Sequence, residues 1–159
     1  GTSYRQNKFF LEKLDVSLKW TIIEQENFVK MGQQEFTTSD LKFVYRLKDI
    51  EDHDIDVVVL SCSLCYLEKP YEVLNEIISC KPRFILISRN PMIESNHDSV
   101  ALQTVRSSIY KASYPVWNFD FTKFKNFFLD DYDCLLQWDD EIQDFGKARS
   151  VGFLYSLKQ

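Results

Sequence analysis

The sequence predicts an α/β fold with a parallel sheet, because helix-like and strand-like stretches alternate along the chain. The clearest strand is Asp56–Ser61 (DVVVLS), a nearly continuous apolar run of the kind buried on both faces of a sheet. The 159 residues include only 4 Gly and 4 Pro, and they contain no repeat and no low-complexity linker. We therefore predict a single domain over residues 1–159.

The first half of the chain shows two helical and three extended stretches. We predict helices at Tyr4–Leu14 and Gln25–Phe36, and strands at Lys19–Glu24 (KWTIIE), Leu41–Leu47 (LKFVYRL) and Asp56–Ser61. In the second helix, Phe28 and Met31 are spaced to face the core.

The second half begins with a helix at Pro70, since proline suits the first turn of a helix. An apolar stripe at helical spacing follows, formed by Tyr71, Leu74, Ile77 and Ile78. We then predict a buried strand (Arg83–Ser88), an irregular aromatic stretch (Arg89–Asp120) with one short helix between Asp98 and Ser108, an amphipathic helix (Phe121, Phe124, Phe127, Phe128) and two closing strands (Tyr132–Trp138, Val151–Leu157). The closing strands can pair antiparallel, and the element order is that of a doubly wound sheet lacking its first strand.

Charge and composition exclude several classes of protein. The formal net charge is −5, from 19 Lys+Arg against 24 Asp+Glu, which argues against nucleic-acid binding. No apolar run approaches the roughly 18–20 residues that span a bilayer, and no secretion signal is present. Four irregularly spaced cysteines indicate a reducing compartment, so we expect a cytoplasmic protein.

Glu24 is the first candidate for chemistry, because it ends an apolar strand. Open α/β sheets bind ligands at the carboxyl ends of their strands, and a carboxylate there can accept two hydrogen bonds from a ribose diol. A solvated strand end or a cap for the next helix is an equal alternative on position alone.

A second candidate is SCSLCY (Ser61–Tyr66), in which Cys62 and Cys65 form a CxxC motif. A helix N-terminus would favour the thiolate there and permit redox chemistry. Two ordinary cysteines in a buried turn are the stronger interpretation. Zinc is disfavoured, since no second CxxC and no HxxxH supply the remaining ligands, and we predict no metal.

His97 and Asp98 could act as a general base with its orienting carboxylate, if the loop that holds them borders a pocket. A solvated loop is the stronger interpretation. The aromatic residues that follow either close a core edge or line a pocket wall suited to a sugar or planar group, and they are Tyr110, Tyr114, Pro115, Trp117 and Phe119.

Several of these segments together resemble a family of S-adenosylmethionine-dependent methyltransferases encoded among bacterial surface-polysaccharide genes. The resemblance covers nearly the whole chain and depends on GTSY (Gly1–Tyr4), WTIIEQ (Trp20–Gln25), DVVVLSCSLCYLEKPYEVL (Asp56–Leu74), FILISRNP (Phe84–Pro91), SIYKASYPVWNF (Ser108–Phe119) and GFLYSL (Gly152–Leu157). It implies a three-layer, Rossmann-like class I methyltransferase sheet, mostly parallel with an antiparallel closing strand.

The resemblance also implies a set of residues that hold S-adenosylmethionine. Gly1 would be the last glycine of the cofactor-binding turn, with Thr2 and Ser3 beside it, and Glu24 would bind the ribose hydroxyls. Arg46 and Leu47 would lie near the adenine. The turn of Ser61, Cys62 and Ser63 would lie beneath the methionine part, with Tyr66 as a wall.

On the acceptor side we predict Arg89, Tyr110, Tyr114 and Trp117 as substrate-binding residues and His97 with Asp98 as the catalytic pair. The expected reaction is methylation of a sugar or polysaccharide precursor, with a small-molecule or glycan acceptor. A non-catalytic α/β binding or partner domain is the alternative, followed by a CxxC thiol oxidoreductase.

The family pattern places a first strand and a glycine-rich turn before Gly1, and this chain begins without them and without Met. We therefore interpret it as N-terminally truncated. The absent strand would leave a gap between the strands at Lys19–Glu24 and Asp56–Ser61. An unpaired strand edge there would favour a homodimer.

Overall fold

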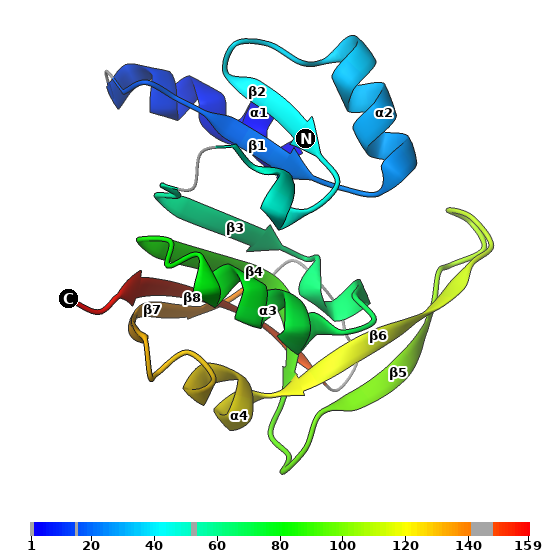
Figure 1. Cartoon of the computed structure of the whole chain (residues 1–159). Coiled ribbons are helices and arrows are strands. Elements are labelled where there is room, and N and C mark those ends of the chain that lie inside the picture. The colour runs from blue at the N-terminus through cyan, green and yellow to red at the C-terminus, as the bar shows by residue number, and fades with distance from the viewer. Residues whose placement is uncertain (1, 15, 52–53, 141–147) are drawn as a thin grey trace. The chain divides into compact units, whose positions relative to one another are not determined.

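A computed structural model describes residues 2–14, 16–51, 54–140 and 148–159 of the chain (Figure 1). These residues form two compact units, residues 1–53 and residues 54–159, and each is described by itself. The expectation of a single domain stays a prediction.

The first unit contains two helices and a pair of parallel strands. Its elements are α1 (Thr2–Leu11), the 3₁₀ turn η1 (Glu12–Leu14), β1 (Trp20–Ile23), α2 (Glu26–Glu35), β2 (Leu41–Val44) and the 3₁₀ turn η2 (Leu47–Asp49). The predicted elements are confirmed, although the second strand ends at Val44 because the chain turns into η2. Trp20 lies opposite Leu41, and Ile22 lies opposite Phe43.

Both helices cover the same face of this strand pair. The ring of Tyr4 in α1 packs edge-on against that of Trp20, with centroids 5.8 Å apart. A Cβ added to Gly32 of α2 would lie 2.3 Å from the ring of Phe43, which is on the same face as Trp20. The absence of a side chain at Gly32 therefore lets α2 approach the strands closely.

The expectation that Phe28 and Met31 face the core is wrong. Their side chains are 55% and 48% exposed, whereas Val29 and Gly32 are buried. The buried stripe is one residue further along the helix, a rotation of about 100°. The spacing of apolar residues does not reveal this stripe, because Gly32 contributes no apolar side chain to it.

The second unit holds one mixed sheet with short helices. Its elements are β3 (Val57–Ser61), the 3₁₀ turn η3 (Leu64–Tyr66), α3 (Pro70–Ser79), β4 (Phe84–Ile93), β5 (Ser99–Thr104), β6 (Ser113–Asp120), α4 (Phe121–Asn126), β7 (Tyr132–Asp139) and β8 (Arg149–Leu157). The strand order is β5-β6-β4-β8-β7, with β3 also paired to β4. Strand β4 is parallel to β3 and β6 but antiparallel to β8, so the sheet is mixed and the expected mostly parallel sheet is not confirmed.

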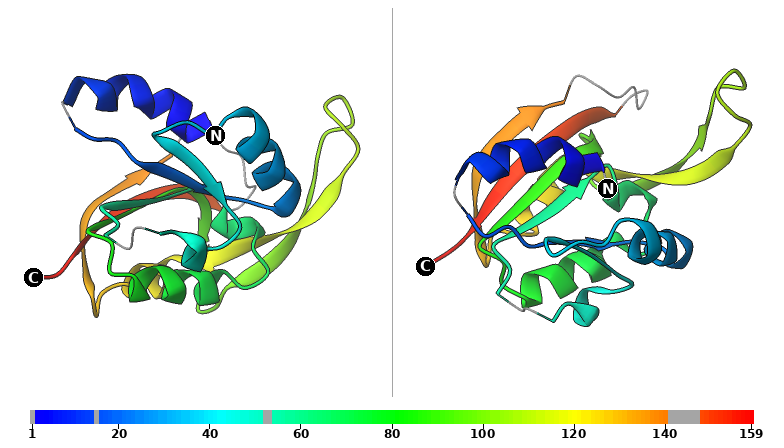
Figure 2. Two further views of the ribbon diagram at one scale, coloured as in Figure 1. Left: turned by 45° about the horizontal axis from the view of Figure 1, so that its top comes forward. Right: turned by 90° about the horizontal axis from the view of Figure 1, so that it is seen from above.

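Helices α3 and α4 cover one face of this sheet, as the two views of Figure 2 show. Ile85 and Ile87 of β4 point to this face and are fully buried. Phe153 and Tyr155 of β8 lie opposite them, and the ring of Tyr155 stacks on that of Phe128 at 4.3 Å. The predicted helices at Pro70 and Phe121 are confirmed, and so is the antiparallel closing pair β7–β8.

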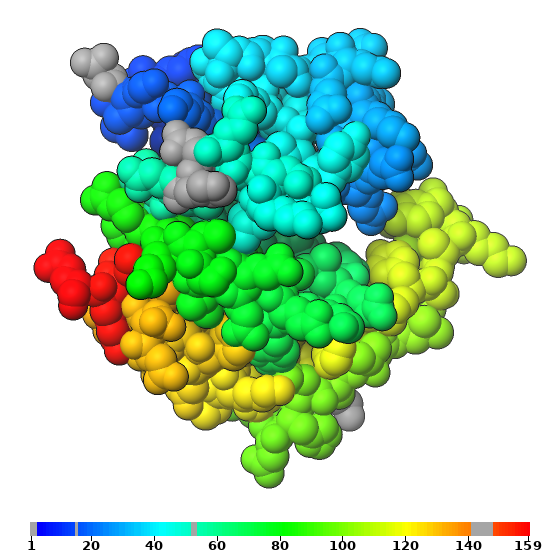
Figure 3. All heavy atoms as spheres, in the orientation of Figure 1, coloured from blue at the N-terminus to red at the C-terminus, as the bar shows by residue number. Residues whose placement is uncertain are grey.

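The stretch predicted to be irregular is a β-hairpin. Strands β5 and β6 pair antiparallel from Ser99 opposite Asn118 to Thr104 opposite Ser113, so the short helix expected between Asp98 and Ser108 is wrong. The tip of the hairpin projects from the second unit in the space-filling view (Figure 3). Pairing between strands depends on partners distant in sequence, which overrides local helix preference.

The strands β1 and β3 belong to separate sheets: among the described residues, β1 pairs with β2 and β3 pairs with β4. Each therefore has one edge that no described strand covers, and a homodimer through such an edge stays a prediction. Neither unit forms three layers by itself. In the described ranges, no helix combines the length and the apolar character needed to cross a membrane.

Candidate functional site

Three predicted cofactor residues share one edge of the first unit. Strands β1 and β2 are parallel, so both end at the same edge. Glu24 follows β1, donates its amide to the carbonyl of Val44 at 3.3 Å and exposes its carboxylate. Arg46 and Leu47 follow β2, and the Arg46 guanidinium lies 3.5 Å from the carboxylate of Asp49.

The carboxylate of Glu24 accepts one hydrogen bond, from the amide of Gln25 at 3.1 Å. Gln25 is the N-cap of α2, so this bond does not reach the amides inside the helix. The alternative of Glu24 as a helix cap therefore has little support. The exposed carboxylate retains acceptor capacity for a ligand.

Thr2 and Ser3 are the first residues of α1, which runs antiparallel to β1 in Figures 1 and 2. The amino end of the helix consequently points toward the edge at which β1 ends. This is the direction expected of a helix that presents its free amides to a ligand. Gly1 lies outside the described residues.

In the second unit, the parallel strands β3 and β4 end beside each other in an unusual backbone conformation. Ser61 lies opposite Ser88, and the amide of Cys62 donates to the Ser88 carbonyl at 2.9 Å. The next residue along the chain has a positive φ in both cases, 52° at Cys62 just after β3 and 57° at Arg89 within β4. Such residues cost roughly 1–3 kcal/mol each and cluster at functional sites.

Arg89 sits in an irregularity of the β4–β8 pairing between Ile87 and Asn90. Bulges of this kind redirect a side chain and are common beside active sites. Here the guanidinium is directed to β3, where Nε and Nη2 donate to the Ser61 hydroxyl at 3.1 and 2.7 Å. The Arg89 amide donates to the carboxylate of Asp140 at 2.7 Å. The backbone conformation of Arg89 is therefore stabilised by hydrogen bonds to Ser61 and to Asp140.

Tyr66 extends this group of residues toward the hairpin. Its hydroxyl donates to the amide oxygen of Gln103 on β5 at 3.3 Å and lies 3.9 Å from the Cys62 thiol. Its ring packs edge-on against Tyr114 on β6, with centroids 5.6 Å apart. Burial, followed by a hydrogen bond with Tyr110, raises the pKa of Tyr114, so Tyr110 belongs to the same row of phenols.

The structure thus brings together residues predicted separately for cofactor and acceptor. We call this group the strand-end cluster, and it consists of Ser61, Cys62, Tyr66, Arg89, Gln103, Tyr110 and Tyr114. Ser63 lies within the same turn, between Cys62 and η3. Polar hydrogen-bonding groups next to aromatic faces are suited to a ligand that combines a planar ring with hydroxyl groups.

Trp117 lies apart from Tyr114. It pairs across the hairpin with Val100, whereas Tyr114 pairs with Gln103, so the two rings point to opposite faces of β6. The Trp117 indole donates to the Leu67 carbonyl at 2.9 Å. It lines a pocket of about 290 Å³ with residues that include Val100 and Leu67.

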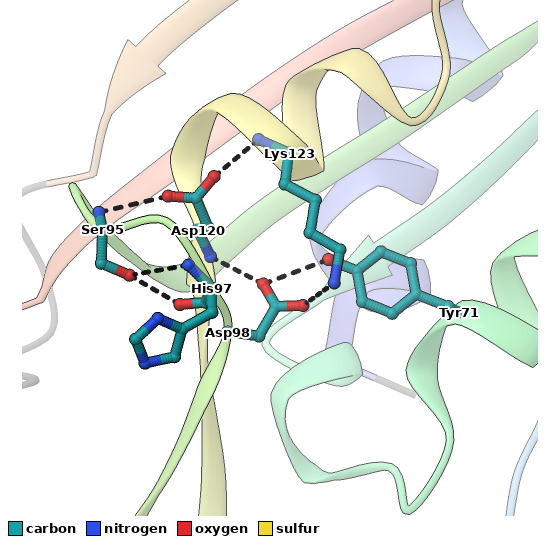
Figure 4. Close-up of polar contacts among 6 residues, drawn as sticks. All are labelled: Tyr71, Ser95, His97, Asp98, Asp120 and Lys123. Atoms are coloured by element: carbon teal, nitrogen blue, oxygen red, sulfur yellow. Dashed lines mark hydrogen bonds and ion pairs between the residues drawn. The ribbon is translucent and has the colours of Figure 1, made fainter.

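The structure does not form the expected His97–Asp98 pair. Figure 4 shows the exposed imidazole of His97 directed away from the Asp98 carboxylate. Asp98 instead accepts hydrogen bonds from the Asp120 amide at 2.8 Å and the Tyr71 hydroxyl at 3.3 Å, and it forms an ion pair with Lys123. Burial, and then the Asp98 carboxylate, raise the pKa of Tyr71.

These contacts give Asp98 a role in holding the second unit together. Its side chain is only 6% exposed, and it links the β4–β5 loop to α3 and to the start of α4. Asp120 completes the network, because its carboxylate accepts from the amides of Ser95 at 3.1 Å and Lys123 at 2.8 Å (Figure 4). A carboxylate with all these partners is not available to orient His97.

The thiols of the CxxC motif do not have the environment of a thiol oxidoreductase. Cys65 is fully buried, and a hydrogen bond with Cys62 together with burial raises the pKa of its thiol. An oxidoreductase needs a lowered thiol pKa. Within the described ranges, no group of three or more His, Cys, Asp or Glu side chains could hold a metal ion.

Gln103 and Asp140 were not among the residues that the sequence suggested. Gln103 lies in the stretch taken as irregular, and Asp140 follows the closing strand β7. Their contacts join residues 37 and 51 positions apart. Only the paired strands bring them to the strand-end cluster, so local sequence carries no signal for either.

Comparison with solved structures identifies the fold. One similar structure is a S-adenosylmethionine-dependent methyltransferase from Methanosarcina mazei, with a TM-score of 0.62 and 11% identity over 86% of this chain and 81% of that one. Another is the glycopeptide N-methyltransferase MtfA in complex with S-adenosyl-L-methionine, with a TM-score of 0.61 and 11% identity over 93% of this chain and 80% of that one. MtfA with S-adenosyl-L-homocysteine gives a TM-score of 0.60 and 12% identity over 87% and 72%.

The chain therefore has the Rossmann-like fold of the S-adenosylmethionine-dependent methyltransferases. No family model matches the sequence, and no curated protein matches it. At identities near 11%, the likeness is one of fold.

Proposed function

We propose that this protein is a S-adenosylmethionine-dependent methyltransferase. The observation that carries the proposal is the strand-end cluster, which lies at the carboxyl ends of parallel strands in a fold shared with such enzymes. In open α/β sheets this edge is where ligands bind. The two positive φ angles at Cys62 and Arg89 support a functional role for the same edge.

Each unit by itself contains residues that are proposed to contact the cofactor. In the first unit, Glu24 accepts hydrogen bonds from the ribose hydroxyls, Arg46 and Leu47 contact the adenine, and Thr2 and Ser3 present the amino end of α1. In the second unit, the turn of Ser61, Cys62 and Ser63 contacts the methionine part, and Tyr66 forms a wall. Gly1 completes this proposed set.

When bound, S-adenosylmethionine supplies a methyl group on a sulfonium, which an acceptor displaces in line. The protein contributes chiefly by orienting the acceptor and by excluding water. Arg89 is fixed for this purpose by two hydrogen bonds to Ser61, and Tyr66 is fixed by Gln103. His97 remains the proposed base for the acceptor proton, acting without Asp98 as its partner.

The proposed acceptor is a hydroxyl of a sugar or polysaccharide precursor. Support comes from the phenols of Tyr66, Tyr110 and Tyr114, whose apolar faces and polar hydroxyls suit a sugar ring. Trp117 lies on the other face of the hairpin from Tyr114, so its proposed contact would involve the neighbouring pocket, which Tyr66 also lines.

Calorimetric titration with S-adenosylhomocysteine tests the proposal, with 5′-methylthioadenosine and ATP as comparison ligands. We expect saturable 1:1 binding of S-adenosylhomocysteine and weaker binding of ATP, which lacks the amino-acid part. Absence of S-adenosylhomocysteine binding would contradict the proposal and favour a non-catalytic binding domain.

A further inference from the structure

The strand-end cluster contains a single charged side chain, the guanidinium of Arg89, and its other members carry neutral hydroxyl, thiol, amide or phenol groups. The chain has a formal net charge of −5, so this positive group differs in sign from the protein as a whole. We propose that Arg89 binds an acidic group on the methyl acceptor, so that the acceptor is a sugar bearing a carboxylate or a phosphate. This inference depends on the proposed function, because it names the class of its substrate.

Arg89 uses only part of its hydrogen-bonding capacity within the protein. Its Nε and Nη2 atoms donate to the Ser61 hydroxyl at 3.1 and 2.7 Å, and together they form one edge of the planar guanidinium. The neighbouring edge, formed by Nη1 and Nη2, keeps two parallel N–H groups that make no hydrogen bond within the described ranges. Such an edge matches the two oxygens of a carboxylate or phosphate, which accept a parallel pair of hydrogen bonds.

The charge of Arg89 has no acidic partner in the part of the chain that the structure describes. By contrast, Arg83, six positions earlier, forms an ion pair with Asp56 at 3.2 Å. The carboxylate of Asp140 is near, but its two oxygens accept from the Trp138 indole and from the Arg89 backbone amide. The Arg89 side chain is also partly buried, and removing a charge from water costs free energy unless an opposite charge compensates it. An acidic group on a ligand would supply that compensation.

The groups next to Arg89 suit the ring to which such an acidic group is attached. Ser61, which accepts from Arg89, is followed by Cys62, whose thiol donates to the Tyr66 hydroxyl at 3.9 Å. The ring of Tyr66 packs against that of Tyr114, and burial raises the pKa of Tyr66, so its hydroxyl stays protonated at neutral pH. These phenols therefore add no negative charge, and their faces and hydroxyls can contact a sugar ring. An acidic sugar matches both the charge and the aromatic character of the cluster.

Two other roles for the guanidinium lead to different experimental results. If Arg89 only stabilises the Ser61 hydroxyl, acidic and neutral sugars should bind equally well. If Arg89 instead binds the carboxylate of the cofactor's amino-acid part, its replacement should weaken binding of S-adenosylhomocysteine. The acceptor role predicts that its replacement removes the preference for acidic sugars and leaves binding of S-adenosylhomocysteine unchanged.

The test is an NMR titration of the whole chain, with and without S-adenosylhomocysteine, in which methyl glucuronide and glucose 6-phosphate are compared with the neutral methyl glucoside. We expect the Arg89 Nε–H signal to shift with saturation for at least one acidic sugar, which should bind at least about tenfold more tightly than the glucoside, or about 1.4 kcal/mol. A response to the glucuronide alone identifies a carboxylate, and a response to the phosphate alone identifies a sugar phosphate. Arg89→Gln should remove the preference, whereas Arg83→Gln, which removes the arginine paired with Asp56, should retain it.

Several results would overturn this inference: equal affinity for acidic and neutral sugars, an Arg89 Nε–H signal that stays in place, or acetate bound as tightly as the glucuronide. Loss of S-adenosylhomocysteine binding in a folded Arg89→Gln protein would also overturn it, by assigning the guanidinium to the cofactor. The signal of the unaltered chain decides the matter if the variant does not fold. Binding of S-adenosylhomocysteine without any preference for acidic sugars would leave the proposed function intact. Binding of an acidic sugar through Arg89 without S-adenosylhomocysteine binding would contradict the proposed function and leave the acidic-group site intact.

Discussion

The carboxylate of Asp98 is almost fully enclosed, whereas that of Glu24 is open to solvent. Both were candidates because of their positions beside predicted strands. The Asp98 carboxylate forms an ion pair with Lys123 and accepts hydrogen bonds from the Tyr71 hydroxyl and the Asp120 amide. Asp98 therefore contributes to the stability of the second unit. Glu24 accepts a single local hydrogen bond and keeps the capacity to bind a ligand.

Replacing Glu24 with Gln should weaken S-adenosylhomocysteine binding by about tenfold or more, since charge-assisted hydrogen bonds to the ribose diol contribute about 1.5–3 kcal/mol each. Calorimetry measures the change. Glu35→Gln, another exposed carboxylate at the end of α2, is the matched control and should bind as the unaltered chain does. Equal affinity for Glu24→Gln and the control would rule out the ribose role.

Replacing Asp98 with Asn should destabilise the second unit by about 1–3 kcal/mol, because the Lys123 ammonium loses its charged partner next to a buried site. Urea unfolding followed by tryptophan fluorescence measures the loss. Asp133→Asn, at an exposed position of β7, should stay within about 0.5 kcal/mol of the unaltered chain. An Asp98→Asn protein as stable as this control would show that the network in Figure 4 contributes little.

At the scale of elements, the strand pair β7–β8 is connected to the strand-end cluster by hydrogen bonds of Asp140, the residue after β7. A Cβ on Gly152 of β8 would lie 2.2 Å from the Trp138 indole, so only glycine permits this approach. The same indole donates to Asp140 at 2.8 Å, and Asp140 accepts the Arg89 amide. A packing contact between two strands is thereby linked to the backbone conformation of Arg89.

Gly152→Ala should therefore destabilise the protein by about 1–3 kcal/mol, the usual cost of overpacking, because the Trp138 ring must move. The fall in urea midpoint measures this effect. Leu135→Ala, at a half-exposed position of the paired strand β7, should have a clearly smaller effect. If Gly152→Ala were as stable as the unaltered protein, the indole would be free to shift, and the link to Arg89 would be absent.

The elements that the sequence predicted well are those with strong local patterns. The run DVVVLS, the stripe on α3 and the closing strands depend on their own residues, and each forms the predicted element. The expected burial of DVVVLS on both faces is not confirmed, because Val57 is 49% exposed and the other residues of β3 are only partly buried. The β5–β6 hairpin was missed because its strands are stabilised by each other and by contacts such as Trp117 with Leu67, 50 positions away. Gln103 was missed for the same reason, because it lies on this hairpin. Phe28 was placed on the wrong face of α2 because the buried face includes Gly32, which has no side chain to mark it as apolar.

At the scale of the whole molecule, buried phenols make the second unit sensitive to alkali. Tyr132 is fully buried and donates its hydroxyl to the Pro82 carbonyl at 2.9 Å. Burial raises the pKa of Tyr132 to about 12 and also raises that of Tyr155. An exposed tyrosine ionises near pH 10, so the folded state holds these protons at a pH where the unfolded chain releases them.

The contribution of these two phenols to stability should therefore be constant below about pH 10 and should be lost as the pH rises from 10 toward 12, because the unfolded chain binds fewer protons than the folded chain in this range. Urea midpoints at a series of pH values, with absorbance near 295 nm reporting phenolate, measure the effect. Tyr132→Phe should show a weaker dependence on pH. A slope unchanged by that substitution would contradict the assignment.

The central claim, that the chain binds S-adenosylmethionine, is tested most directly by residue-resolved amide NMR during titration with S-adenosylhomocysteine. The account predicts that the amides of Glu24, Arg46 and Leu47 in the first unit shift with saturation, and that those of Ser61 to Tyr66 in the second unit do so too. Amides at the hairpin tip, such as Arg106 and Lys111, should stay in place. Shifts confined to other regions, or none at saturating ligand, would contradict the claim.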